Sequence, residues 1–208
     1  GTALLVGGST AEGVEALERA VAADPGNVPL SLDLARAYLL AGRASEAAAT
    51  LSSLPAGEGG ALRRQLTVLA EVSGRDPAAA RASVLRLADA HGSDAELLAT
   101  AASYLLTTGD APTALQVFER ALEAAPGNAQ IRGGLASAAF RAGDRARAEA
   151  ELRRAMEVDP RFEGAYLGLA RLALLDGDRS AARRWLERAV GAEPAALESR
   201  MQLAEIAM

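Results

Sequence analysis

Hydrophobic residues recur along the chain at the spacing of amphipathic helices, in short stretches separated by glycine and proline. The clearest unit covers residues 95–128. Its first apolar stripe includes Leu98 and Leu105, at the spacing of one helix face, and Gly109 ends it. A second stripe follows and ends before Pro126, because the residue preceding a proline disfavours helical geometry. This pattern predicts two helices joined by a tight turn.

The same unit recurs every 34 residues in the second half of the chain, with no insertion. Glycines end the first helices and prolines end the second helices, and each set is spaced by 34: Gly109, Gly143 and Gly177; Pro126, Pro160 and Pro194. A 34-residue period of this kind predicts a helix–turn–helix repeat array. The predicted fold class is therefore all-α, a solenoid of antiparallel helix pairs with about six repeats.

The repeat boundaries follow from this period and predict a single solenoid over residues 1–208. Its parts are a partial repeat (1–27), a repeat with a flexible loop at 55–60 (28–60), an irregular repeat (61–94), three regular repeats (95–128, 129–162 and 163–196) and the terminal helix of a truncated repeat (197–208). One residue is missing across the irregular part, because Pro25 and Pro126 lie 101 rather than 102 residues apart. Both ends fall inside repeats, so we interpret the chain as a segment of a longer protein.

Composition supports helices and argues against several other classes. Half of the residues are hydrophobic but only 3% are aromatic, and alanine dominates the apolar set. Small side chains let helices approach closely. No apolar run approaches the roughly 18 residues of a membrane span, so membrane insertion is not expected. The chain has no cysteine, which excludes disulfides and thiolate chemistry within it.

Charge does not indicate a nucleic-acid partner. The net charge is −5, with 15 acids and 9 bases in residues 1–128 and 12 acids and 13 bases in residues 129–208. This distribution lacks the basic face of a nucleic-acid binder. All 22 basic residues are arginine. A GC-rich genome explains that bias, and selection for planar guanidinium contacts is the alternative.

The residues needed for catalysis are few, so we expect no enzyme, cofactor or metal site. His91 is the only histidine and stands beside Gly92, where a helix-end or surface role is favoured over proton transfer. Without a second histidine or a cysteine, a zinc site is not expected. Asp110, Asp144 and Asp178 follow the turn glycines, and we expect them to cap the next helices.

The repeats resemble those of the tetratricopeptide repeat family over nearly the whole chain. The family's first-helix motif is matched in degenerate form by residues 34–38 (LARAY) and 166–170 (YLGLA). The second-helix motif is better kept, in residues 114–121 (ALQVFERA) and 182–189 (ARRWLERA). The resemblance implies a right-handed superhelix whose first helices line a concave groove for a protein or peptide partner.

A narrower resemblance concerns residues 1–5 (GTALL) and 13–25 (GVEALERAVAADP). These segments are similar to the long tetratricopeptide proteins of bacterial exosortase/PEP-CTERM systems, which are associated with exopolysaccharide production. The resemblance implies an envelope-associated scaffold in a Gram-negative bacterium. The sequence leaves the compartment open between the bacterial cytoplasm and the periplasm or envelope.

Helical phase predicts which residues of the first helices line the groove. The candidates form a mostly apolar trough with spaced arginines, suited to an extended or helical peptide with acidic groups. They are Leu32, Arg36, Leu39, Arg64, Val68, Ser103, Leu106, Ser137, Phe140, Arg141, Leu167, Arg171 and Leu174. The carboxylate clamp known in the family requires lysine, and this chain has none.

The sequence allows two interpretations for each of two features, a glycine pair and the arginine clusters, and for the function. The pair Gly133-Gly134, within a predicted helix, indicates either close helix packing or the approach of a partner backbone. The arginines of residues 145–154 and 179–188 form either solvated, partly paired faces or a surface for an anionic partner. The leading hypothesis is a non-enzymatic scaffold that binds a protein or peptide. The alternative is a structural spacer or a module that self-associates through its ends.

Overall fold

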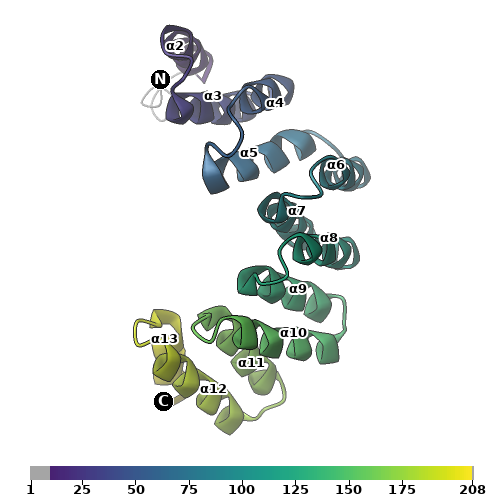
Figure 1. Cartoon of the computed structure of the whole chain (residues 1–208), viewed down its shortest axis with the longest axis vertical. Helices are drawn as coiled ribbons and strands as arrows, with labels where there is room; N and C mark the ends of the chain where they lie inside the picture. The colour runs from purple at the N-terminus through teal and green to yellow at the C-terminus, as the bar shows by residue number, and fades with distance from the viewer. Residues whose placement is uncertain (1–9, 208) are drawn as a thin grey trace. The chain divides into compact units, whose positions relative to one another are not determined.

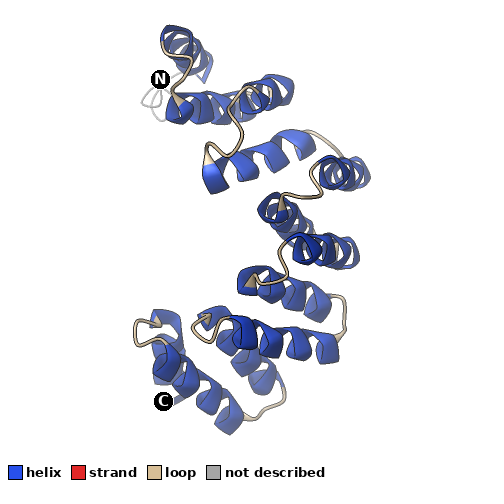
Figure 2. Ribbon diagram, in the orientation of Figure 1, coloured by secondary structure: helices blue, strands red, loops and turns tan. Residues whose placement is uncertain are grey.

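The computed structural model describes residues 10–207, which form twelve α-helices and no strand (Figures 1 and 2). The resemblance carried by residues 1–5 lies outside the described residues. The helices are α2 (Thr10–Ala23), α3 (Val28–Leu40), α4 (Ala44–Ser52), α5 (Gly60–Val72), α6 (Pro77–Ala90), α7 (Ala95–Thr107), α8 (Ala111–Ala124), α9 (Ala129–Arg141), α10 (Arg145–Val158), α11 (Glu163–Leu175), α12 (Arg179–Ala192) and α13 (Leu197–Ala207).

Successive helices pack against each other as a series of hairpins. The helix α9 contacts both α8 and α10, and α11 contacts both α10 and α12. Nearer the N-terminus, α3 contacts α2 and α4 in the same way. First helices of neighbouring repeats also contact each other: α3 contacts α5, and α9 contacts α11. The predicted all-α helical repeat fold is confirmed.

The chain divides into two compact units, residues 1–104 (unit 1) and residues 105–208 (unit 2), with the boundary inside α7. The core of unit 1 joins α2, α3, α4 and α5 through buried residues that include Val14, Leu34 and Leu51. Unit 2 has a cluster around Leu152 and Leu169 and another around Leu186. Each unit is therefore held by apolar side chains that consecutive helices share.

The turns inside the repeats use glycine and aspartate for different reasons. Gly109 and Gly143 have φ values of +86° and +89°, a left-handed conformation that costs glycine little. The following aspartates each accept a hydrogen bond from a backbone N–H in the next helix: Asp110 at 3.3 Å, Asp144 at 2.9 Å and Asp178 at 2.7 Å. The caps predicted for these three aspartates are confirmed.

A polar cluster joins α2, α3 and α4 in unit 1. The Tyr38 hydroxyl donates to Oε1 of Glu18 at 2.9 Å, and the Arg43 guanidinium lies 4.4 Å from the centre of the Tyr38 ring. Burial, reinforced by the bond to Glu18, raises the pKa of the Tyr38 hydroxyl. A hydrogen bond from Arg43 at 2.9 Å lowers the pKa of the Glu46 carboxyl. The cluster therefore favours a neutral tyrosine and an ionised glutamate.

The pair Gly133-Gly134 is explained by packing within unit 2. A Cβ atom at Gly134 would lie 2.4 Å from Cε1 of Phe118, which projects from α8. A Cβ atom at Gly133 would lie 2.9 Å from Cε1 of Phe162, in the turn before α11. Two aromatic rings thus occupy the space that side chains on α9 would need. Close packing, rather than a partner backbone, accounts for both glycines.

All four arginines of α10 form ion pairs, and one of the four on α12 does. Arg147 pairs with Glu119 of α8, and Arg153 pairs with Glu149 one turn earlier at 2.6 Å. On α12, Arg183 pairs with Glu187 at 2.8 Å. Arg188 instead lies over the Trp185 ring, 4.6 Å from its centre. These contacts favour the solvated, partly paired faces over a surface for an anionic partner.

Candidate functional site

Two adjoining cavities lie along the first helices of unit 2. We call these two cavities together the unit 2 groove. The first lies between α9 and α11 and has a volume of about 170 Å³, and the second lies between α11 and α13 and has a volume of about 380 Å³. Gly168 and Arg171 line both cavities, so the two lie side by side along α11. The groove therefore runs along one series of first helices.

Glycines set the depth of this groove. Gly164 and Gly168 occupy the first two turns of α11, and both line the cavity beside α9. A Cβ atom at Gly168 would lie 2.7 Å from Cδ2 of Leu152, and one at Gly164 would lie 2.7 Å from Cζ of Phe162. The side chains beneath thus pack directly on the α11 backbone, and the groove floor is apolar.

The charged side chains of the unit 2 groove differ between its two cavities. Arg141 and Arg171 line the cavity between α9 and α11. Arg141 donates to the carbonyl oxygen of Leu106 at 2.9 Å, whereas no hydrogen bond or ion pair joins the exposed Arg171 to another described residue. Glu198 and Glu205 line the cavity at α13. The groove is therefore basic at α9–α11 and acidic at α13.

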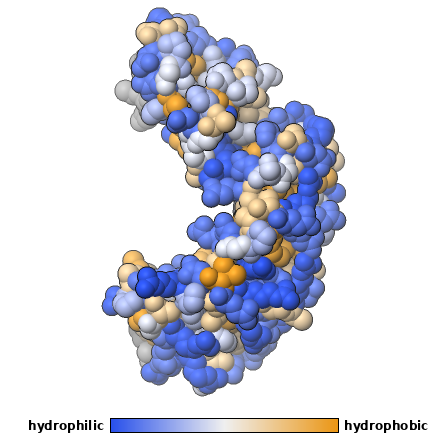
Figure 3. Space-filling model, viewed as in Figure 1, coloured by the Kyte–Doolittle hydropathy of each residue, from blue (hydrophilic) through white to orange (hydrophobic). Residues whose placement is uncertain are grey.

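Unit 1 has a groove of its own between α3 and α5, with a volume of about 580 Å³. Arg36 and Leu39 reach it from α3, and Leu62 and Leu69 reach it from α5. Leu69 is 45% exposed, so apolar surface is open to solvent here. Figure 3 shows that apolar side chains on the visible face lie in small groups among polar ones.

The structure places the thirteen predicted groove residues in several different settings. The walls of the unit 2 groove include six of them: Ser137, Phe140, Arg141, Leu167, Arg171 and Leu174. Arg36 and Leu39 line the unit 1 groove, and Ser103 is exposed on α7. Leu32, Val68 and Leu106 are between 2% and 8% exposed and belong to the core, so they offer a partner almost no surface.

The remaining candidate, Arg64, lies on a different face of α5 from the unit 1 groove. Its guanidinium pairs with Glu96 of α7. On α5, the residues that sequence analysis missed are Leu62, Gln65 and Leu69, which line the groove in place of Arg64 and Val68. Because successive helix positions differ by about 100°, a shift of one residue along α5 exchanges its faces. The first helices α3, α5 and α7 begin at residues 28, 60 and 95, so the 34-residue period does not give the phase of α5.

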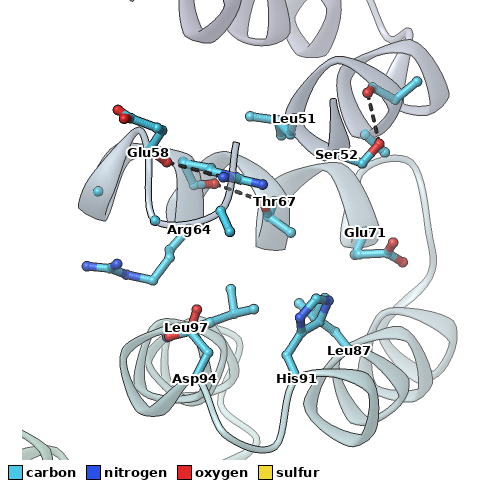
Figure 4. Close-up of a pocket in the computed structure, with 16 residues that line it drawn as sticks. Leu51, Ser52, Glu58, Arg64, Thr67, Glu71, Leu87, His91, Asp94 and Leu97 are labelled. Carbon is cyan, nitrogen blue, oxygen red and sulfur yellow. Dashed lines mark hydrogen bonds between the residues drawn. The ribbon is translucent and has the colours of Figure 1, made fainter. Parts of the chain in front are cut away.

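Arg64 lines another cavity of unit 1, which we call the α4–α7 cavity (Figure 4). Its volume is about 580 Å³, and its walls come from α4, the segment 56–58, α5, the end of α6 and the start of α7. Leu51, Leu87 and Leu97 supply apolar surface. Glu71 and His91 approach it from α5 and from the end of α6. This cavity was not predicted from the sequence.

The described residues offer little chemistry beyond binding. Among them, no cluster of three or more histidine, cysteine, aspartate or glutamate side chains is arranged to hold a metal ion. His91 is exposed and takes the C-cap position of α6. Within residues 10–207, no helix is both long and apolar enough to cross a membrane. The sites that the described structure presents are open grooves.

Models of two families, both described as tetratricopeptide repeat, match the sequence. One matches residues 7–72, 105–161 and 139–206, and the other matches residues 67–129. Together they extend over most of the chain. No curated protein sequence shows a significant match.

Several solved structures share this fold. The C-terminal part of a TPR repeat-containing protein from Cytophaga hutchinsonii aligns with a TM-score of 0.60 and 17% identity, over 95% of this chain and 80% of that one. A MamA RS-1 double mutant gives a TM-score of 0.56 at 17% identity, over 82% and 97% of the two chains. YrrB, described as a TPR protein with an unusual peptide-binding site, gives 0.54 at 17% identity, over 90% and 99%.

Proposed function

Because the chain belongs to the tetratricopeptide repeat family, whose members are protein- and peptide-binding scaffolds, we propose that it is a non-enzymatic scaffold whose unit 2 groove binds a segment of a partner protein. The observation that carries this proposal is the position of Arg171. It is an exposed cation at the junction of two cavities, and no other described residue pairs with it. The description of YrrB as a peptide-binding protein supports the class of ligand.

The walls of the unit 2 groove define the chemistry of the bound segment. Phe140, Leu167 and Leu174 offer apolar surface, which favours an apolar anchor in the segment. The cavity between α9 and α11 is smaller than the range of about 300–1,000 Å³ usual for small-molecule pockets. It therefore suits a side chain of a peptide better than a free metabolite.

Charge complementarity predicts the order of the acidic, apolar and basic groups along the bound segment. A guanidinium binds a carboxylate with two parallel hydrogen bonds, so the α9–α11 cavity favours an aspartate or glutamate beside the apolar anchor. The acidic α13 wall, with Glu198 and Glu205, favours a basic residue at the other end. The proposed ligand is a short segment that carries acidic, apolar and basic groups in that spatial order.

Selection from a random peptide display library tests this proposal. Peptides enriched on the wild-type chain should carry a carboxylate next to an apolar residue, and Arg171→Ala should weaken the enriched peptides about tenfold. Fluorescence anisotropy measures the change. The matched control is Arg153→Ala, which removes an arginine on α10 that is paired with Glu149 and lies outside the groove. Equal binding to both variants, or no enrichment, would contradict the proposal.

A second candidate function is self-association, favoured by the surface of α13. Leu197 and Met201 stand one turn apart on this helix and are 66% and 57% exposed. Apolar side chains at this spacing form a ridge that a second copy of the chain can cover.

Light scattering after size exclusion, across a dilution series, tests self-association. A molar mass that rises with concentration above 21.3 kDa is expected, together with its loss in the double variant Leu197→Ser, Met201→Ser. The reason is that serine removes the apolar surface that association would bury. A mass that stays at the monomer value at every concentration excludes this candidate.

A further inference from the structure

The α4–α7 cavity is separate from the groove of unit 1, because the two use different faces of α5. Arg64, Thr67 and Glu71 follow one another at three- and four-residue spacing and face the α4–α7 cavity. Leu62, Gln65 and Leu69 have the same spacing but lie on the face toward α3. A ligand in the cavity therefore meets side chains that the groove does not use.

The cavity exists because α4 is short. This second helix has 9 residues, whereas α6, α8, α10 and α12 have 14 each. More than one turn is missing, and the segment 53–59 replaces it. Arg63 holds this segment by donating to the carbonyl oxygens of Pro55 at 2.6 Å and Leu54 at 3.2 Å. The cavity is thus bounded on one side by a segment that Arg63 hydrogen-bonds.

The lining combines an apolar floor with an excess of carboxylates. Leu51, Leu87 and Leu97 line it and are 2%, 8% and 5% exposed, so only a small part of each side chain faces the cavity. Three carboxylate side chains stand on the walls, against two guanidinium groups. Both guanidinium groups are engaged, one with backbone carbonyls of the 53–59 segment and the other with a glutamate of α7.

Glu71 is one of two lining acids, with Glu58, whose carboxylates bind no other described residue. Asp94 already accepts a hydrogen bond from the Leu97 N–H at 2.9 Å. No hydrogen bond or ion pair joins the Glu71 carboxylate to another described residue, and Figure 4 shows it across the cavity from His91. Glu58 is exposed and belongs to the 53–59 segment, where its backbone carbonyl oxygen accepts from Arg63, whereas Glu71 projects from α5.

We propose that the α4–α7 cavity binds an arginine side chain of a partner protein. The aliphatic stem of an arginine packs along the floor at Leu87 and Leu97, while its guanidinium reaches Glu71. Arginine fits better than lysine because a guanidinium is more weakly hydrated and binds a carboxylate with two bonds. The site shares no lining residue with the unit 2 groove, so it gives the chain a second contact.

An NMR titration of the ¹⁵N-labelled chain tests the proposal, with the peptide acetyl-Leu-Arg-Leu-amide as the probe. Amide shifts are expected at Thr67, Glu71 and His91. The same peptide with citrulline in place of arginine keeps the shape but loses the charge, and it should cause no such shifts at equal concentration. Glu71→Gln should weaken the arginine peptide about tenfold. Glu123→Gln, an exposed position on α8, is the matched control.

Several outcomes would overturn the proposal. They are equal shifts with the citrulline peptide, unchanged binding to Glu71→Gln, tighter binding of acetyl-Leu-Glu-Leu-amide, or shifts confined to the α3–α5 groove at Leu39 and Leu69. Circular dichroism of Glu71→Gln should match the wild type, because the replaced side chain has the same shape and is partly exposed. Arg171→Ala should leave this titration unchanged, so failure here is distinct from failure of the unit 2 groove.

Discussion

Replacing Glu151 with alanine is expected to destabilise unit 2 by about 3 kcal/mol, the largest effect of any single substitution that we predict. The Glu151 side chain is 6% exposed on α10 and binds two arginines. Its Oε2 accepts from Arg132 of α9 at 3.0 Å, and its Oε1 accepts from Arg154 at 2.6 Å. The carboxylate therefore joins two helices of one repeat.

The loss is large because of what remains after the carboxylate is removed. The Arg132 side chain is only 18% exposed, and its Nε has no hydrogen-bond partner in the described structure. Its one other bond goes from NH2 to the carbonyl oxygen of Pro126 at 3.1 Å. A largely buried cation without a counter-charge costs several kcal/mol of desolvation. Arg154 contributes little, since it is 59% exposed.

Urea unfolding followed by Trp185 fluorescence measures this change, because Trp185 packs in the core of unit 2. The control Glu149→Ala removes an exposed pair from the same helix and should cost less than about 0.5 kcal/mol. The double variant Glu151→Leu, Arg132→Met should recover most of the stability, because neither charge is then buried. Equal losses for Glu151→Ala and Glu149→Ala would contradict the argument.

Local chemistry explains why the fold was predictable from the sequence. The turn glycines occupy left-handed backbone, the following aspartates cap helices, and apolar positions recur at helical spacing. Each signal acts within a few residues, so each is readable without tertiary information. The first helices α7, α9 and α11 accordingly begin 34 residues apart, at Ala95, Ala129 and Glu163. The narrower exosortase/PEP-CTERM resemblance stays a prediction.

The groove was less predictable, because exposure depends on how a helix is rotated against its neighbours. In the regular repeats, helical phase identified wall residues such as Phe140 and Arg171. In the irregular repeat, the same rule selected Val68, which is 2% exposed, and Arg64, which lines the α4–α7 cavity. A lost residue rotates the pattern by about 100°, and its location cannot be fixed from the repeat period alone.

The α4–α7 cavity was missed because it arises from an absent element rather than from a motif. The interval between Arg43 and Pro55 has room for only a short helix, and that was the one available signal. Whether such a gap is filled by a loop or left open depends on side-chain packing. Here Arg63 holds the loop at one side of the gap, and the opening remains between α4 and α7.

Replacing Gly134 with alanine is expected to destabilise unit 2 by about 2 kcal/mol, although alanine favours helix more than glycine does. The added Cβ would lie 2.4 Å from Cε1 and 2.6 Å from Cζ of Phe118. That ring is 2% exposed, so it cannot turn out into solvent without leaving the core. Relief requires α8 and α9 to separate or the ring to leave its preferred rotamer, and either change disturbs the core.

Gly191 provides a matched control with the opposite expected sign. This glycine lies in α12, and a Cβ there meets no atom within 4 Å. Gly191→Ala should therefore stabilise the unit by up to about 1 kcal/mol, which is the helix preference without the clash. Urea unfolding followed by circular dichroism and by Trp185 fluorescence compares the two variants. A stabilising effect at both positions would show that the Phe118 ring yields freely.

A double-mutant cycle assigns the cost at Gly134 to the aromatic ring itself. Phe118→Leu removes the ring atoms nearest to the new Cβ but keeps an apolar side chain in the core. If the clash is the cause, Gly134→Ala should cost about 2 kcal/mol in the wild-type background and much less in the Phe118→Leu background. The same cost in both backgrounds would mean that the α9 backbone, and not Phe118, makes position 134 intolerant of a side chain.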